Sequence, residues 1–272
     1  MVKAHAKLNL FLDVKEKRED NFHNVVFVNT ELVLHDEIEI EEHNKGISIE
    51  CNNKKVPINK DNLCYKSVES LNIKNIKIKI KKKIPMGGLG GGSADAAVVL
   101  KALNKKYNLK FSREELIKKA EQISTDACFS IIGGTALVEG KGEKITQLPK
   151  IAKFFVLLID PKIKIENKTK YMYEHIDTKN VFHPKVKKIL NALEQKNKKQ
   201  ILASCVNIFE QVKIREYIPI KKLIFELKQK GFKAMLAGEG PLVVVLAEEK
   251  EKLKKLQKAL KGRYFTILTE TK

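Results

Sequence analysis

The N-terminal part of the chain alternates between apolar and polar positions, the pattern of β-strands that bury one face. The alternating segments are AKLNLFLDV, NVVFVNTELVL, EIEIEE, ISIECNN and NIKIKIKKKI. EIEIEE and ISIECNN flank HNKG, a short loop with a glycine, and this arrangement predicts a β-hairpin. In the last segment, isoleucines at 76, 78 and 80 alternate with lysines. If the acidic strand 37–42 lies beside it, cross-strand Glu–Lys pairs are expected.

The period of the pattern changes after the first glycine cluster. Apolar residues then recur at helical spacing: Ala96, Val99, Leu100, Leu103 and Tyr107. Ser112-Arg-Glu-Glu115 has the form of a capping box and predicts a second helix through Leu116 and Ala120. Residues 133–143 are typical of a strand and a turn. FFVLLIDP, at 154–161, predicts a buried strand that ends at a proline.

The remainder of the chain mixes helical and strand patterns. Helices are expected at 186–195, 220–230 and 248–260, and strands at LVVVLA and YFTILTE. The fold class is therefore α+β. We place a domain boundary near residues 150–155, which gives an N-terminal domain of residues 1–152 and a C-terminal domain of residues 153–272. The chain shows no internal repeat.

Composition narrows the class of protein. Of 272 residues, 43% are hydrophobic and 32% are charged, which is typical of a globular protein rather than a disordered one. No run of 18 or more apolar residues occurs, and the N-terminus lacks the apolar stretch of a signal peptide. The four cysteines are scattered and are expected to be buried free thiols in a reducing cytoplasm. The six histidines do not cluster, so no structural zinc site is indicated.

The formal net charge of +20 is compatible with nucleic acid or small anions as partners. The lysines, however, are spread through the whole chain between Glu, Asn and Ile. No stripe of alternating aromatic and basic residues suggests stacked bases. We therefore interpret most of the lysines as solvated surface.

The segment IPMGGLGGGSADAAVVLKAL, residues 84–103, holds five glycines within six positions. A glycine turn between a strand and a helix makes an anion site, because the first N–H groups of a helix lack partners and its dipole favours negative charge. A tight turn that binds nothing is the alternative. The Walker pattern fails because no lysine follows the last glycine, and the Rossmann pattern fails because Ser93 takes the place of its third glycine.

The segment 85–97 resembles the second motif of the GHMP kinases. Its triple glycine before serine is similar to the motif of one branch of these kinases. That branch acts in the non-mevalonate isoprenoid pathway and phosphorylates a cytidine-diphosphate-linked methylerythritol. The resemblance covers most of the chain. The other matching segments are Ala6–Phe11, Asn21–His23, Asp61–Leu63, Thr125–Asp126, Gly133–Ala136, Gly140–Glu143 and Ala237–Gly240. It implies a ribosomal-protein-like N-terminal domain, a ferredoxin-like α/β sandwich at the C-terminus and an active site between them.

The resemblance implies transfer of the ATP γ-phosphoryl group to the C2 hydroxyl of the methylerythritol unit. Asp126 would accept the hydroxyl proton, and Lys7 beside it would stabilise the developing negative charge. Asn9 would lie on the same side of a strand as Lys7 and hydrogen-bond the erythritol hydroxyls. Without the resemblance, Asp126 could equally be a helix cap and Lys7 an ordinary lysine at a strand edge.

The resemblance also assigns the two nucleotide ends. Phe22, His23 and Tyr173 would bind the cytosine, although Phe22 and Tyr173 could be core aromatics instead. The residues expected on the ATP side are Asn62, Lys82, Pro85, Met86, Gly87, Gly88, Leu89, Gly90, Gly91, Gly92 and Ser93. Mg²⁺ is expected together with ATP. No acidic cluster in the sequence indicates a separate magnesium site, which fits the tendency of Mg²⁺ to bind with the nucleotide and to keep several waters. The sequence leaves the assembly state open, a homodimer included.

The chain departs from the family pattern in several places. The glycine loop is one residue shorter than is common. Asn21 replaces a glycine, Phe22 a tyrosine, and Ala127-Cys128 the usual Val-Pro. Glu239 stands where a small hydroxyl residue is typical, and a carboxylate beside phosphates would repel them.

The sequence leaves three alternatives open. One is a GHMP kinase for another small alcohol, of the homoserine or mevalonate type, for which the Phe22, His23 and Tyr173 group would be superfluous. A second is a basic nucleic-acid-binding protein, suggested by the net charge of +20; we expect no specific nucleic acid. A third is a catalytically silent relative, which the retained Lys7 and Asp126 disfavour.

Overall fold

A computed structural model describes residues 1–85 and 87–272. Within these residues the chain forms a seven-stranded sheet and a four-stranded sheet. The strands are β1 (Val2–Lys17), β2 (His23–Glu42), β3 (Ile47–Cys51), β4 (Ile76–Lys81), β5 (Thr135–Glu139), β6 (Lys144–Gln147), β7 (Phe155–Asp160), β8 (Val206–Asn207), β9 (Lys233–Leu236), β10 (Val243–Ala247) and β11 (Phe265–Glu270). The α+β fold class is confirmed.

The helices are α1 (Leu63–Ser70), α2 (Gly91–Lys106), α3 (Arg113–Ile123), α4 (Thr125–Ile132), α5 (Lys168–His175), α6 (Lys187–Glu194), α7 (Lys198–Ser204), α8 (Ile218–Gln229) and α9 (Lys250–Leu260). The sequence pattern predicted α2, α3, α6, α8 and α9, whereas α1, α4, α5 and α7 were not predicted. Two short 3₁₀ segments, Ile208–Gln211 and Arg215–Tyr217, precede α8. Among the described residues, no helix has the length and apolar character that crossing a membrane requires.

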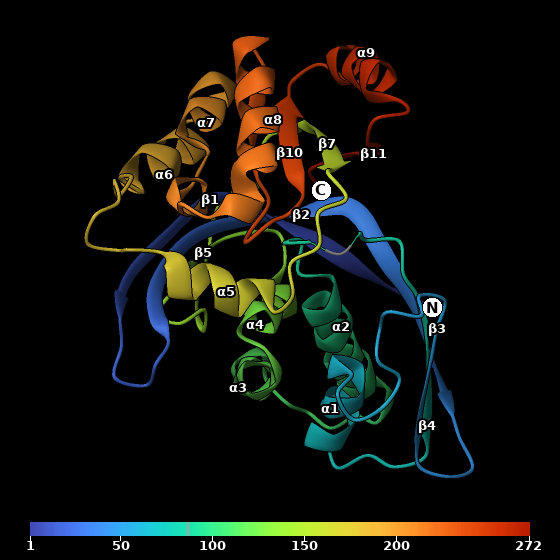
Figure 1. The fold of residues 1–272 in the computed structure, drawn as a ribbon. Coiled ribbons are helices and arrows are strands. Elements are labelled where there is room, and N and C mark those ends of the chain that lie inside the picture. The colour runs from blue at the N-terminus through green and yellow to red at the C-terminus, as the bar shows by residue number, and fades with distance from the viewer. Residues whose placement is uncertain (86) are drawn as a thin grey trace.

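Two long antiparallel strands, β1 and β2, organise the first sheet (Figure 1). The strand order is β3-β4-β2-β1-β8, and β5 pairs with β2 and carries β6. From Ala6 to Val14 every residue of β1 is buried, because helices cover one face of the sheet and the C-terminal elements cover the other. The sequence suggested two segments between residues 24 and 42, whereas the structure has a single strand there.

The predicted hairpin between residues 37–42 and 47–52 is wrong. Strand β4 lies between β2 and β3, antiparallel to β2 and parallel to β3. In a hairpin, Glu50 of β3 would have lain beside the glutamates of β2, and like charges on neighbouring strands are destabilising. The basic strand β4 separates them instead. Its Lys79 pairs with Glu41 at 2.7 Å, and its Lys77 pairs with Glu50 at 2.6 Å. The expected Glu–Lys pairs and the inward-facing isoleucines are confirmed.

Helices α1 to α4 pack on one face of the first sheet (Figure 1). The capping box that opens α3 is confirmed, since Ser112 Oγ accepts from Glu115 N and Glu115 Oε2 accepts from Ser112 N. The helix after the glycine cluster is α2, which begins at Gly91. Lys101 of α2 donates to the Ser130 carbonyl at 2.8 Å, near the end of α4. A lysine at a helix C-terminus satisfies carbonyls that lack partners, and this one ties α4 to α2.

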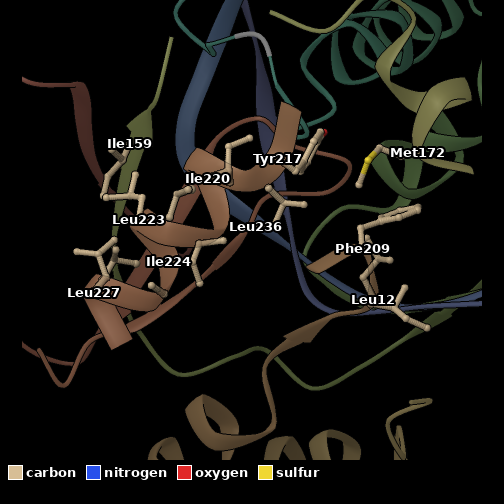
Figure 2. Close-up of a cluster of buried hydrophobic side chains, with 14 of the residues drawn as sticks. Leu12, Ile159, Met172, Phe209, Tyr217, Ile220, Leu223, Ile224, Leu227 and Leu236 are labelled. Atoms are coloured by element: carbon tan, nitrogen blue, oxygen red, sulfur yellow. The ribbon is translucent and has the colours of Figure 1, made fainter. Parts of the chain in front are cut away.

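The second sheet, ordered β11-β7-β10-β9, covers the other side of the molecule together with α6 to α9. Figure 2 shows α8 packed by Ile220, Leu223 and Leu227 against this sheet, with Leu12 of β1 in the same cluster. The second half of the chain also returns to the first sheet, because β8 pairs with β1. The proposed division into residues 1–152 and 153–272 stays a prediction.

The glycine loop between β4 and α2 meets the segment 237–240 with backbone against backbone. A Cβ atom on Gly88, whose φ is +85°, would lie 1.9 Å from the Ala237 carbonyl oxygen. From the other side, a Cβ atom on Gly238 would lie 2.8 Å from the Gly88 carbonyl oxygen. The loop is also tied to β1, because Lys7 N donates to Leu89 O at 2.9 Å. Glycine is therefore required here by space and by backbone conformation.

Two glycine-to-alanine variants test this contact. Gly88→Ala should lower the free energy of unfolding by at least about 2 kcal/mol, because it combines a left-handed backbone with a collision against backbone. Gly92→Ala should raise it by about 0.4–1 kcal/mol, because Gly92 is helical and a Cβ there would meet only Leu63, at 3.7 Å. Urea unfolding measures both, and equal effects of the two substitutions would contradict the proposed packing.

Candidate active site

Lys7 and Asp126 form an ion pair between β1 and the first turn of α4. Lys7 Nζ lies 3.0 Å from Asp126 Oδ1. The lysine side chain is 5% exposed and that of the aspartate 37% exposed, so the carboxylate faces open space while the ammonium lies behind it. Ser124 occupies the N-cap position of α4 in extended conformation, and Asp126 lies in the first turn, at the positive end of the helix. The two residues expected to be catalytic are therefore brought together.

Asn9 lies behind Lys7 and is wholly buried. Its Oδ1 accepts from Lys7 Nζ at 3.4 Å, and its Nδ2 donates to Asn29 Oδ1 at 2.7 Å. The side chain thus holds the lysine in place from below. The contact with erythritol hydroxyls that was expected for Asn9 stays a prediction.

The N-termini of α2 and α4 meet at the same place. The Ser93 and Ser124 hydroxyl oxygens lie 2.9 Å apart and join the two helix starts. Each N-terminus presents N–H groups without intrahelical partners and the positive end of a helix dipole. Together with Lys7, they concentrate positive potential beside the glycine loop. This arrangement is suited to binding phosphate groups.

A cleft of about 2020 Å³ opens in front of these groups. Its lining includes the glycine loop at Pro85, Gly87 and Ser93, the carboxylate of Asp126, and the segment 160–179 on the opposite side. The volume exceeds the 300–1,000 Å³ of a typical small-molecule pocket, so two ligands fit side by side. Eight lysines and five carboxylates line the cleft, which therefore attracts anions.

An aromatic group lies at one end of the cleft. The rings of His23 and Tyr173 have centroids 5.3 Å apart, and Tyr173 rests edge-on against Phe209 at 5.1 Å. Burial, aided by the nearby charge of Lys17, lowers the pKa of His23, so this imidazole is neutral at pH 7. Phe22 is 50% exposed at the rim and lies under Lys141 Nζ, at 5.4 Å from the ring centroid. Phe22, His23 and Tyr173 all line the cleft, as expected.

The residues expected on the ATP side divide into three groups. Pro85, Gly87 and Ser93 line the cleft, whereas Gly88 packs against Ala237 and Leu89 is buried in the core. Asn62 is buried and caps α1, accepting from Cys64 N at 2.8 Å. Lys82 is enclosed between Asp36 and Asp95 behind the loop. Met86 lies outside the described residues.

Glu239, the acidic residue in the third glycine motif, also lines the cleft. Its carboxylate lies 3.7 Å from Lys168 Nζ at the start of α5. This neighbour compensates the negative charge that the sequence places beside the phosphate site. Tyr217 donates a hydrogen bond to the Glu239 carbonyl oxygen and fixes the backbone of the motif.

Within residues 1–85 and 87–272, no group of three or more His, Cys, Asp and Glu residues is arranged to hold a metal ion. The oxygen donors at the convergence of α2 and α4 are Asp126 and the hydroxyls of Ser93 and Ser124. Oxygen donors of this kind, few in number, fit a Mg²⁺ ion that arrives on a nucleotide and keeps several waters.

Several residues of the site were not singled out from the sequence. Ser124 precedes Thr125-Asp126 and could have been recognised as a helix cap. Asp95 lies in the second turn of a predicted helix, and Asp36 lies within a strand. Neither position belongs to a sequence motif that would indicate a functional role. Lys168 and Lys141 are two lysines among many. Their positions depend on contacts between segments far apart in the chain.

Comparison with known proteins adds an independent line of support. Residues 62–134 match the GHMP kinases N terminal domain. A 4-diphosphocytidyl-2-C-methyl-D-erythritol kinase from Clostridium botulinum is 34% identical over 98% of this chain and 97% of its own length. A crystal structure of 4-(cytidine 5'-diphospho)-2C-methyl-D-erythritol kinase superposes with a TM-score of 0.82 at 25% identity and covers 99% of this chain and 98% of its own. The homoserine kinase of Cytophaga hutchinsonii reaches a TM-score of 0.70 at 18% identity, covering 98% of this chain and 93% of its own, and shares the fold.

The two sheets, the glycine loop at the start of α2 and the Lys7–Asp126 pair define a GHMP kinase. Within that class, sequence identity over nearly the full length identifies the particular kinase family. The chain belongs to the 4-diphosphocytidyl-2-C-methyl-D-erythritol kinase family.

Proposed function

We propose that this protein transfers the γ-phosphoryl group of ATP to the C2 hydroxyl of 4-diphosphocytidyl-2-C-methyl-D-erythritol, giving the 2-phosphate and ADP in non-mevalonate isoprenoid synthesis. The observation that carries the proposal is the Lys7–Asp126 pair, 3.0 Å apart at the point where the N-termini of α2 and α4 meet the glycine loop. Relatives about a third identical over 90% or more of their length carry this kinase name.

Phosphoryl transfer depends on in-line positioning and on neutralisation of charge. The glycine loop and the two helix N-termini hold the phosphates of ATP, with Ser93 at their centre. Asp126 accepts the proton of the attacking hydroxyl. Lys7 stabilises the carboxylate before transfer and the charge that develops during it. Asn9 acts through Lys7, because its amide oxygen holds the ammonium in position.

The aromatic end of the cleft supports a pyrimidine as the remote part of the acceptor. A neutral His23 both donates and accepts hydrogen bonds, which suits the polar edge of cytosine. Phe22 and Tyr173 offer aromatic surfaces for the ring. A short-chain alcohol such as homoserine or mevalonate makes no use of these groups.

The remaining features of the proposal concern the setting of the reaction. Mg²⁺ carried by ATP would supply charge neutralisation on the phosphates, and Asp126, Ser93 and Ser124 would be the oxygen donors available to hold it. All four cysteines are free thiols, three of them buried, which supports a cytoplasmic location.

We retain the two domains, 1–152 and 153–272, as a proposal. The homodimer remains a proposal without a specific contact behind it.

Substitution of the ion pair should abolish turnover while leaving ATP binding largely intact. Asp126→Asn should lower kcat at least 100-fold, because the amide cannot accept the proton. Lys7→Met should lower kcat by about 100-fold through loss of charge stabilisation. ADP release with the cytidine-linked acceptor measures both, and the exposed Glu114→Gln on α3 is the control. A variant Asp126→Asn that retains a tenth of wild-type kcat would contradict the assignment of the base.

The aromatic end can be tested separately. Phe22→Ala should raise KM for the cytidine-linked acceptor about tenfold, since stacking of one base on an aromatic ring contributes about 1–3 kcal/mol. KM for ATP should change less than twofold. Phe225→Ala, an exposed phenylalanine on α8, provides the matched control. Equal increases in both KM values would count against a cytosine site at Phe22, and turnover of homoserine or mevalonate at a comparable rate would count against the acceptor itself.

A further inference from the structure

A buried cluster of three charged residues lies directly behind the glycine loop. Lys82 Nζ donates to Asp95 Oδ2 at 2.7 Å and makes a second ion pair with Asp36. The side chains of Asp36, Asp95 and Lys82 are 0%, 2% and 8% exposed. A buried ion pair rarely adds net stability compared with apolar residues of similar volume. The cluster therefore invites an explanation beyond stability.

Asp36 fixes the backbone just before the loop begins. Its Oδ1 accepts hydrogen bonds from Lys83 N at 2.5 Å and from Ile84 N at 2.8 Å. Pro85 and the glycines follow immediately. Asp36 belongs to the long strand β2, so these bonds anchor the entry of the loop to the centre of the first sheet.

Asp95 lies at the other end of the loop, near the start of α2. Lys82 connects it to Asp36, and a Cβ atom on Gly91 would lie 3.2 Å from Lys82 Nζ. The ammonium is thus packed beneath the first turn of α2. The chain of contacts from Asp36 through Lys82 to Asp95 joins the entry of the loop to its exit.

One atom of the cluster lacks a partner. Asp95 Oδ1 is buried without a hydrogen bond, among the residues that the structure describes. Burial, together with the nearby Asp36, raises the pKa of Asp95 to about 7. The titratable and charged groups facing Asp95 are Lys82, Asp36 and the buried thiol of Cys64 on α1. When both carboxylates are ionised, Asp36 and Asp95 together carry one more negative charge than Lys82 neutralises, directly behind the glycine loop.

We propose that Asp36, Lys82 and Asp95 act as positioning residues, a buried clamp that holds both ends of the glycine loop in the conformation that binds the phosphates of ATP. This inference rests on the proposed function and specifies how the ATP side of that site is built. It also gives Lys82 a role behind the loop, whereas the sequence resemblance placed it on the ATP side.

The clamp predicts a selective effect on ATP. Asp36→Ala should raise the Kd of a non-hydrolysable ATP analogue, and KM for ATP, at least tenfold, while KM for the cytidine-linked acceptor changes less than twofold. Asp36→Asn should be intermediate, because its amide oxygen still accepts from the two backbone N–H groups but has no charge for Lys82. Lys79→Gln, on the exposed face of β4, is the matched control and should leave both constants unchanged. Calorimetry without acceptor gives Kd, and initial rates give the KM values.

The outcomes separate this inference from the proposed function. Asp36→Ala and Asp36→Asn proteins that fold by circular dichroism yet bind the ATP analogue as tightly as wild type would overturn the clamp. Tight analogue binding that weakens in the Asp36 variants, without transfer to the cytidine-linked acceptor, would support the clamp and refute the proposed acceptor.

Discussion

The close contact between Gly88 and the segment 237–238 is the constraint on which the site depends. The Gly88 backbone leaves no room for a Cβ against the Ala237 carbonyl oxygen, and Gly238 meets the loop from the other side. The hydrogen bond from Lys7 N to Leu89 O adds β1 to the same junction. The glycine loop, which we propose binds phosphate, is therefore held between the first sheet and a motif near the far end of the chain. Residues remote in sequence form one site because these backbones meet.

This junction also explains how charge is arranged around the cleft. The N-termini of α2 and α4 and the ammonium of Lys7 form a positive region on one side of the loop. Behind the loop, two carboxylates surround Lys82. Across the cleft, Lys168 compensates Glu239, the residue whose charge was hardest to reconcile with a phosphate site. Neighbouring side chains, rather than solvent alone, therefore balance the charges around the glycine loop.

Much of the fold was predictable from sequence, because periodicity and capping act locally. The strands at β4, β7 and β10, the capping box of α3 and the helix after the glycines all follow from patterns within a few residues. Pairing between strands does not. The hairpin expected between residues 37–42 and 47–52 does not form because β4, which comes later in the chain, lies between β2 and β3 and pairs with both. The pairing of Lys7 with Asp126 was expected from family resemblance, whereas the burial of Asn9 and the cluster around Lys82 required coordinates.

The most direct test of the proposed reaction is ³¹P NMR of the full chain with ATP, Mg²⁺ and 4-diphosphocytidyl-2-C-methyl-D-erythritol. We expect a new phosphomonoester signal that grows as ADP forms, with carbon–phosphorus coupling that places the phosphate on the C2 oxygen. Formation of ADP without a phosphomonoester would mean that water, and not the acceptor, receives the phosphoryl group. That result, or a phosphate on another hydroxyl, would contradict the assignment of the cleft as the site of transfer to the C2 hydroxyl.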